Sequence, residues 1–190
     1  MKQAKVPTEQ EFKRLLAIVQ QNRYAARNRV ALMLSYYGGM RVGEIAALAV
    51  GDVFDVDGQV RDQIRLRAEM TKGGNARIVF LNDKLRKEVE QYRASLGERL
   101  HQLQKPLLLT QKRTRFSGNT LCQLLGQLYD DAGIDGGSSH SGRRWFITKL
   151  AHGGISPKVI MTLAGHKHLT TTQRYIDVND EMMRAAVDAL

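Results

Sequence analysis

The chain has 190 residues, 43% of them hydrophobic, which is typical of a folded domain and argues against a disordered chain. Lysine and arginine outnumber aspartate and glutamate by 29 to 19, so the formal charge is +10. A basic surface can be merely solvated, but so large an excess on a small domain favours a polyanionic partner, above all nucleic acid.

The first helix is predicted by a capping box, Thr8-Glu-Gln-Glu11, which precedes apolar residues at helical spacing. A second helix is expected over residues 27–37 and stops at Gly38-Gly39. A third begins near Arg41 and runs through Leu48. The N-terminal quarter of the chain is therefore expected to be helical.

The pattern changes between residues 51 and 81. Short apolar or alternating runs at 53–54, 64–67 and 78–80 are separated by Asp57-Gly58 and by Lys72-Gly-Gly-Asn75. Such runs, divided by turn residues, predict a small antiparallel sheet of two or three strands.

Helical periodicity then returns. The predicted segments are a long helix over 85–96 with Gly97 as a fault within it, a short buried stretch at 106–109, a helix over 121–128, a loop at 133–139, and helices over 140–152 and 157–165. The fold class expected is mainly α with a small antiparallel β-sheet. We find no linker and expect one domain, 1–190.

A terminal helix is expected after Asn179, with one apolar stripe made of Met183, Ala186, Val187 and Leu190. A short helix at a chain end is not stable alone. It must therefore dock, either on its own domain or on a neighbouring molecule.

The surroundings of the protein follow from three features. The single cysteine, Cys122, excludes an internal disulfide, and its apolar helical neighbours predict a small core residue. The N-terminal segment lacks the apolar core of a signal peptide, and the sequence has no apolar run of membrane-spanning length. We therefore expect a cytoplasmic protein without a membrane partner.

The first candidates for chemistry are His140 with a neighbouring arginine, and Arg41 with Glu44. Helical spacing places His140 on one face with both Arg143 and Arg144, so spacing alone leaves the choice of arginine open. Glu44 follows Arg41 at i+3, which is typical either of an exposed ion pair or of an arginine held in place to bind a phosphate.

The remaining candidates are a lysine, a histidine and a tyrosine. Lys72 lies in a Lys-Gly-Gly turn, which is commonly a solvated hairpin tip but could carry a mobile cation. His166 and His168 have no cysteine or carboxylate near them in sequence, so we expect no metal site. Tyr175 is one of six tyrosines, and periodicity alone does not distinguish it.

Taken in order, these residues resemble the tyrosine recombinase (phage integrase) family. The matching motifs are Gly39-Met-Arg41-Val-Gly-Glu44, Lys72, His140-Ser-Gly-Arg143, Leu163-Ala-Gly-His166 and, nine residues later, Tyr175. The resemblance spans nearly the whole chain and favours Arg143 over Arg144. It departs from the family pattern at Ser141-Gly142, which replaces the more usual Asp-Leu and is expected to remove an apolar core contact.

The resemblance implies a role for each residue. Tyr175 would attack a DNA phosphate to form a 3′-phosphotyrosine, and Arg41 and Arg143 would hold the phosphate oxygens. The supporting roles would be general acid for Lys72, help in deprotonating the tyrosine for His140, a hydrogen bond to the phosphate for His166, and orientation of Arg41 for Glu44. The resemblance implies no cofactor or metal.

The resemblance also implies a fold and partners. It predicts a tyrosine recombinase catalytic domain that lacks the family's usual N-terminal core-binding domain, in a bacterial or phage-encoded protein. The partners would be double-stranded DNA and further copies of the chain, which would form a tetramer on DNA. In the absence of DNA the protein could be a monomer. The alternatives are a type IB topoisomerase-like DNA relaxing enzyme and a catalytically inactive DNA-binding module.

Overall fold

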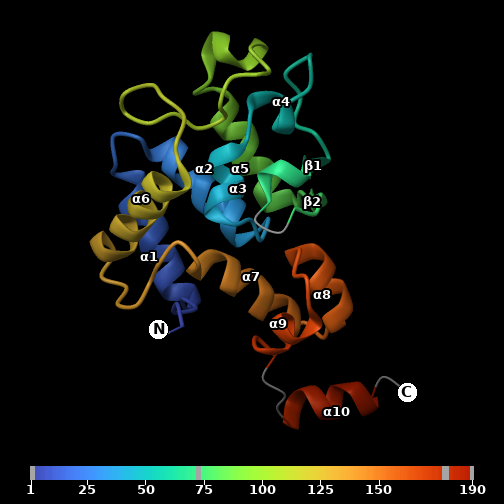
Figure 1. Ribbon diagram of the computed structural model, residues 1–190. Helices are drawn as coiled ribbons and strands as arrows, with labels where there is room; N and C mark the ends of the chain where they lie inside the picture. Colours follow the sequence, from blue (N-terminus) through green and yellow to red (C-terminus); the bar gives the residue numbers. More distant parts are fainter. Residues whose placement is uncertain (1–2, 72–73, 177–179, 189–190) are drawn as a thin grey trace.

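The computed structural model describes residues 3–71, 74–176 and 180–188. In the described part, helices predominate and two short strands form one sheet (Figure 1). The helices are α1 (Glu9–Gln20), α2 (Ala25–Tyr36), α3 (Val42–Ala47), α4 (Val50–Val53), α5 (Asp83–Arg93), α6 (Gly118–Asp131), α7 (Ser141–His152), α8 (Pro157–Ala164), α9 (Leu169–Gln173) and α10 (Asp180–Asp188). The strands are β1 (Gln63–Leu66) and β2 (Arg77–Phe80), and the 3₁₀ turns are η1 (Ala68–Met70) and η2 (Gly97–His101). The predicted fold class is confirmed.

The two strands pair antiparallel, with Ile64 opposite Val79. Both of these side chains are buried, whereas Ile78 and Phe80 of β2 are exposed. This alternation is the pattern expected of a sheet with one face on the core. The pairing also fixes Arg77 at the start of β2, opposite Leu66.

Helix α2 lies at the centre of the main core. Its residues from Val30 to Tyr36 are all buried, and it packs against α1, α3, α5 and α7. A helix without a polar face can be stable only when other elements surround it. At its C-terminal end, the rings of Phe12, Tyr36, Tyr37 and Trp145 pack together, which joins α1 and α2 to α7.

A second, smaller core lies where α7 meets α8. It consists of Ile147, Ala151, Ile160 and Ala164, and Tyr175 packs against its edge. Helix α7 thus connects the main body to the C-terminal helices, and Figure 1 shows α10 standing apart from the rest of the molecule. The C-terminal candidate residues are held by this small core.

Gly142 does not remove a contact, as the sequence suggested, but permits a close one. A Cβ atom at this position would lie 2.7 Å from both the Ser35 hydroxyl oxygen and Cδ2 of Tyr36 on α2. The missing side chain therefore lets α7 approach α2 closely. That approach brings the arginine of α7 near the loop that carries Arg41.

Several local predictions were wrong. Val53 ends helix α4 and is not in a strand, while Phe54 forms only an isolated bridge with Val60. Helix α5 ends at Arg93, before Gly97, which has a left-handed φ of +54° and opens η2. Cys122 is exposed on α6, within 3.1 Å of the Ser139 hydroxyl. Helix α9 was not predicted.

Candidate active site

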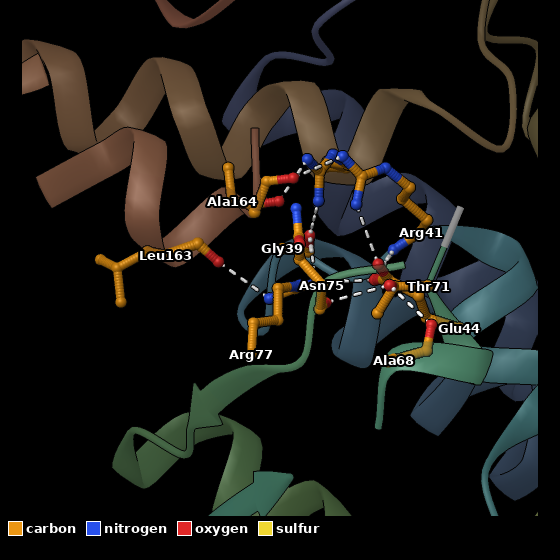
Figure 2. A network of polar contacts seen from close by, with 11 residues as sticks. Gly39, Arg41, Glu44, Ala68, Thr71, Asn75, Arg77, Leu163 and Ala164 are labelled. Atoms are coloured by element: carbon orange, nitrogen blue, oxygen red, sulfur yellow. Dashed lines mark hydrogen bonds and ion pairs between the residues drawn. The ribbon is translucent and has the colours of Figure 1, made fainter. Parts of the chain in front are cut away.

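Arg41 is placed by a glycine turn and a buried glutamate. It stands at the N-cap position of α3, where its backbone N–H donates to Oε2 of Glu44 over 2.8 Å. Its guanidinium donates to Oε1 of Glu44 over 2.9 Å and to the carbonyl of Gly165 over 3.0 Å. The predicted pairing of Arg41 with Glu44 is therefore present in the structure (Figure 2).

Gly39 must be a glycine in this turn. Its φ is +59°, and a Cβ atom would lie 2.5 Å from the ring of Phe146 on α7. Its carbonyl accepts a hydrogen bond from Nη1 of Arg143. The turn before α3 thus contacts α7 both by packing and by hydrogen bonding.

Arg143 is a buried cation, with 6% of its surface exposed. It donates to the carbonyls of Gly39 and Ala164, which come from opposite sides of the site. Burial, followed by the charges of Arg41 and Arg77, lowers the pKa of Arg143 to about 9. The guanidinium therefore remains cationic at neutral pH, and it keeps N–H groups beyond the two that bind carbonyls.

Glu44 supplies the negative charge among these cations, and it is 1% exposed. Burial by itself raises the pKa of this carboxyl, but the charge and hydrogen bond of Arg77, and then Arg41, outweigh burial and lower it. A buried carboxylate with two arginine partners stays ionised and fixes both guanidinium groups.

His166 follows the turn that ends α8. Gly165 caps this helix in the left-handed conformation, with φ of +63°, and His166 comes next. Its Nδ1 lies 2.8 Å from the hydroxyl of Thr172, a fully buried residue of α9. A Thr172 hydroxyl that donates to Nδ1 leaves the ring proton on Nε2, the tautomer that can donate to a phosphate.

The imidazole of His166 is held neutral. Burial, followed by the charges of Arg143, Arg41 and Arg77, lowers the pKa of His166 to about 4. At neutral pH, His166 is therefore a neutral hydrogen-bond donor, and the positive charge of the site resides on the arginines.

Tyr175 lies between His166 and a further arginine. Its ring stacks on that of His166, with centroids 5.9 Å apart, and the Arg144 guanidinium lies 5.3 Å from its centroid. A cavity of about 290 Å³ opens beside the ring, lined by His140, Arg143, Arg144, Thr171, Arg174, Tyr175, Gln3 and Ala4. His140 is exposed at the N-cap position of α7.

The structure thus brings Arg41, Glu44, His140, Arg143, His166 and Tyr175 together from α3, α7, the turn after α8 and the residues after α9. Lys72 lies outside the described residues. Next to it in sequence is Thr71, whose hydroxyl lies 3.0 Å from the carbonyls of Ala68 and Asn75. The roles given to these residues stay predictions.

Sequence reasoning missed three contributors. Arg77 joins the network around Glu44, Thr172 contacts His166, and Arg144 covers the ring of Tyr175. The spacing of α7 did place Arg144 on the face of His140, which was a usable signal. No periodicity marks Arg77, whose partner Leu163 is 86 residues away, or Thr172, whose helix α9 was not predicted.

Among residues 3–71, 74–176 and 180–188, the structure contains no group of three histidine, cysteine, aspartate or glutamate side chains that could hold a metal ion. Within the same ranges, no helix is both long enough and apolar enough to span a bilayer.

The overall fold is that of tyrosine recombinase catalytic domains. The crystal structure of XerA recombinase is 26% identical and superimposes with a TM-score of 0.77, covering 100% of this chain and 66% of that one. The phage integrase family model matches residues 5–182, and the chain belongs to that family.

A curated relative of higher identity supports the family assignment, and a structure of lower identity shares the fold. The tyrosine recombinase XerD of Caulobacter vibrioides is 34% identical over 187 residues, which cover 93% of this chain and 58% of that protein. The Tn1549 transposon integrase, solved in complex with transposon right end DNA, has the same fold with a TM-score of 0.75 at 17% identity, covering 100% of this chain and 67% of that one. The chain spans between about half and two thirds of the length of the curated relatives it matches.

Proposed function

We propose that this chain cuts and rejoins DNA at specific sites through a covalent bond between Tyr175 and a DNA phosphate. The observation that carries the proposal is that His140, Arg143 and Tyr175 line one cavity. The ring of His166 stacks on that of Tyr175, and Arg41 binds the carbonyl of Gly165 beside His166. Buried guanidinium groups stabilise the charge of a pentacoordinate phosphorus, and a hydroxyl beside them supplies a nucleophile.

The proposed step balances without a metal or ATP. The phenol oxygen of Tyr175 forms a bond to phosphorus while the bond from phosphorus to the 5′-oxygen breaks, which leaves a 3′-phosphotyrosine and a 5′-hydroxyl. The phenol proton passes to His140, and the leaving oxygen receives a proton from Lys72. Arg41, Arg143 and Nε2 of His166 bind the non-bridging oxygens.

The same arrangement allows the step to run backwards. The phosphotyrosine retains the energy of the broken phosphodiester, so a 5′-hydroxyl from another strand can attack it and restore continuous DNA. Strands are exchanged between two duplexes when the 5′-hydroxyl that attacks the phosphotyrosine comes from the other duplex. Recombination follows, and the relative from Caulobacter vibrioides is named a tyrosine recombinase.

Double-stranded DNA is the proposed partner. The net charge of +10 supports this choice, because cations placed along a surface gain affinity by releasing the counterions of phosphates. The structurally similar Tn1549 integrase was solved with DNA. We infer that this chain is bacterial or phage-encoded, lies in the cytoplasm and acts as a tetramer on DNA.

Covalent capture tests the proposal. Incubation with nicked half-site DNA from the region of its own gene, followed by a denaturing gel, should give a slowly migrating protein–DNA adduct. Tyr175→Phe should abolish the adduct and leave DNA binding intact. The control is Tyr24→Phe, which removes a hydroxyl from a ring stacked under Arg27, outside the cavity, and should keep the adduct.

The same gel, together with plasmid relaxation and footprinting, distinguishes a recombinase from a topoisomerase-like enzyme and from an inactive DNA-binding module. An adduct together with relaxation of supercoiled plasmid at no preferred site would indicate a type IB topoisomerase-like activity. A footprint on DNA without any adduct would indicate an inactive binding module. An adduct that survives in Tyr175→Phe would move the nucleophile to another residue and contradict the proposal.

A further inference from the structure

Arg77 lies inside the network that holds the catalytic candidates, although it has no place in the motifs of the sequence. It is the first residue of β2, and only 6% of its side chain is exposed. One end of its guanidinium, Nη1, donates to the carbonyl of Leu163 over 2.8 Å. The other, Nη2, donates to Oε2 of Glu44 over 2.7 Å and lies 3.4 Å from the carbonyl of Gly39 (Figure 2).

Each of these acceptors controls a different member of the site. Glu44 binds both the backbone and the side chain of Arg41. The carbonyl of Gly39 is also an acceptor for Arg143. Leu163 lies in the last turn of α8, three residues before His166. One planar guanidinium therefore touches the supports of three proposed phosphate-binding groups.

Arg77 itself does not line the cavity beside Tyr175. It lines a separate groove of about 450 Å³ between β2 and α8, together with residues that include Ile78, Met161, Gly165 and His166. Both terminal nitrogens of Arg77 already donate to protein acceptors, and its side chain is almost fully buried. Its effect on a phosphate at Tyr175 therefore passes through the residues it holds. This makes Arg77 a positioning residue and not a catalytic one.

The turn after α8 is shaped to admit this side chain. A Cβ atom on Gly165 would lie 2.5 Å from Cδ and 3.0 Å from Nε of Arg77. The same glycine has a left-handed φ of +63°. Both the backbone conformation and the side chain packed against it therefore require glycine next to His166.

The charge of Arg77 has a second effect. The groups that face Glu44 are Arg41 from its own helix, Arg77 from β2 and, at longer range, Arg143 from α7. Because burial opposes ionisation of this carboxyl, loss of Arg77 removes the main effect that keeps it charged. A protonated Glu44 would bind Arg41 less firmly.

We propose that Arg77 positions Arg41, Arg143 and His166 for the transfer step by tying Glu44, Gly39 and the C-terminal end of α8 to one guanidinium. This inference rests on the proposed function, since the step being positioned is the attack by Tyr175. A purely structural salt bridge would instead stabilise the fold and leave the rate of the folded protein unchanged.

The first test separates rate from affinity. Arg77→Met, Arg77→Lys and the control Arg86→Met, which loses an exposed pair with Asp62, are compared with the unaltered chain on the half-site DNA. We expect Arg77→Met to slow adduct formation at saturating DNA by about 10- to 100-fold, the loss typical when a residue that only orients a functional group is removed. The half-saturating DNA concentration should change by less than about threefold, since Arg77 lies away from the cavity.

Lysine keeps the positive charge but lacks the planar set of N–H donors of a guanidinium. Arg77→Lys should therefore form the adduct faster than Arg77→Met and more slowly than the unaltered chain. If Arg77→Met does not fold, Arg77→Lys alone decides, with a slower adduct at an unchanged half-saturating concentration expected. Either folded variant reacting at the rate of the unaltered chain overturns the inference. So does an equal loss of rate in Arg86→Met.

The second test does not depend on cleavage. The ring ¹⁵N resonances of His166 report its tautomer and its contact with Thr172, and they can be recorded without DNA. We expect them to shift in Arg77→Met and to stay unchanged in Arg86→Met. If the unaltered chain forms no adduct, the proposed function fails, and these resonances decide: a shift confined to the Arg77 variants supports positioning, and unchanged resonances overturn it.

Discussion

At the scale of single residues, the site is an assembly of positive charge with one buried counter-charge. Glu44 is the carboxylate within it, and Arg41 and Arg77 are paired to it. Arg143 is held instead by two backbone carbonyls, which bring no formal charge. The residual positive potential is what a phosphate diester would neutralise on binding.

The neutral state of His166 gives a prediction about pH. Its pKa is about 4 in the folded protein and near 6.5 when unfolded, so the unfolded chain binds the extra proton between these values. The stability held at neutral pH is therefore lost as pH falls from about 6.5 towards 4. Urea unfolding at pH 7 and pH 5 should show a larger loss for the unaltered chain than for His166→Gln.

The comparison with glutamine cancels the contributions of other titrating groups, because both proteins retain them. Equal losses of unfolding free energy in the two proteins would mean that His166 titrates alike in the folded and unfolded states. That result would contradict the burial of this ring against the arginines.

At the scale of elements, the site depends on how closely α7 approaches α2. The approach occurs at Gly142, one residue before Arg143, and it faces Tyr36, whose hydroxyl accepts a hydrogen bond from Tyr129. A fully buried, hydrogen-bonded ring cannot move aside easily. The crossing of two helices thus sets the depth at which Arg143 enters the site.

We predict opposite effects for the same substitution in two helices. Gly142→Ala should lower the free energy of unfolding by about 1–3 kcal/mol through overpacking. Gly126→Ala, in α6 where a Cβ atom would meet nothing within 4 Å, should raise it by about 0.5–1 kcal/mol through helix propensity. Urea unfolding measures both, and similar values for the two variants would show that α7 and α2 can separate without loss.

At the scale of the whole molecule, α10 stands apart from the body in Figure 1. Its Met183 and Val187 are 52% and 67% exposed. Exposed apolar side chains on a short terminal helix favour burial against another surface. Docking on a neighbouring copy is one of the two possibilities left open by the sequence, and it fits assembly on DNA.

Removal of α10 tests this possibility. The chain ending at Asn179 and the substituted chain Met183→Ser with Val187→Ser should both form smaller assemblies on DNA than the unaltered chain. Light scattering of the free proteins and of their DNA complexes measures the change. A mass that is the same for all three chains, free and bound, would reject exchange of this helix between copies.

The sequence determined the helical character of the chain, the hairpin and the motif residues, because these depend on local spacing. Thr8 and Glu11 form the predicted capping box, and Gly165 ends α8 as expected. The order of Arg41, His140, Arg143, His166 and Tyr175 was also sufficient to indicate the family. These features need only neighbouring residues or a comparison of motifs.

Tertiary structure decided which side chains the motifs rely upon. Arg77 acquires its contacts from partners up to 86 residues away, and local periodicity carries no information about such distances. Thr172 contacts His166 only because the chain turns between α8 and α9. The sequence suggested that Gly142 removes an apolar core contact, whereas in the fold its missing side chain lets α7 pack closely on α2. Cys122 was predicted inside and lies outside, because the face that a helix buries is set by its neighbours and not by its own composition.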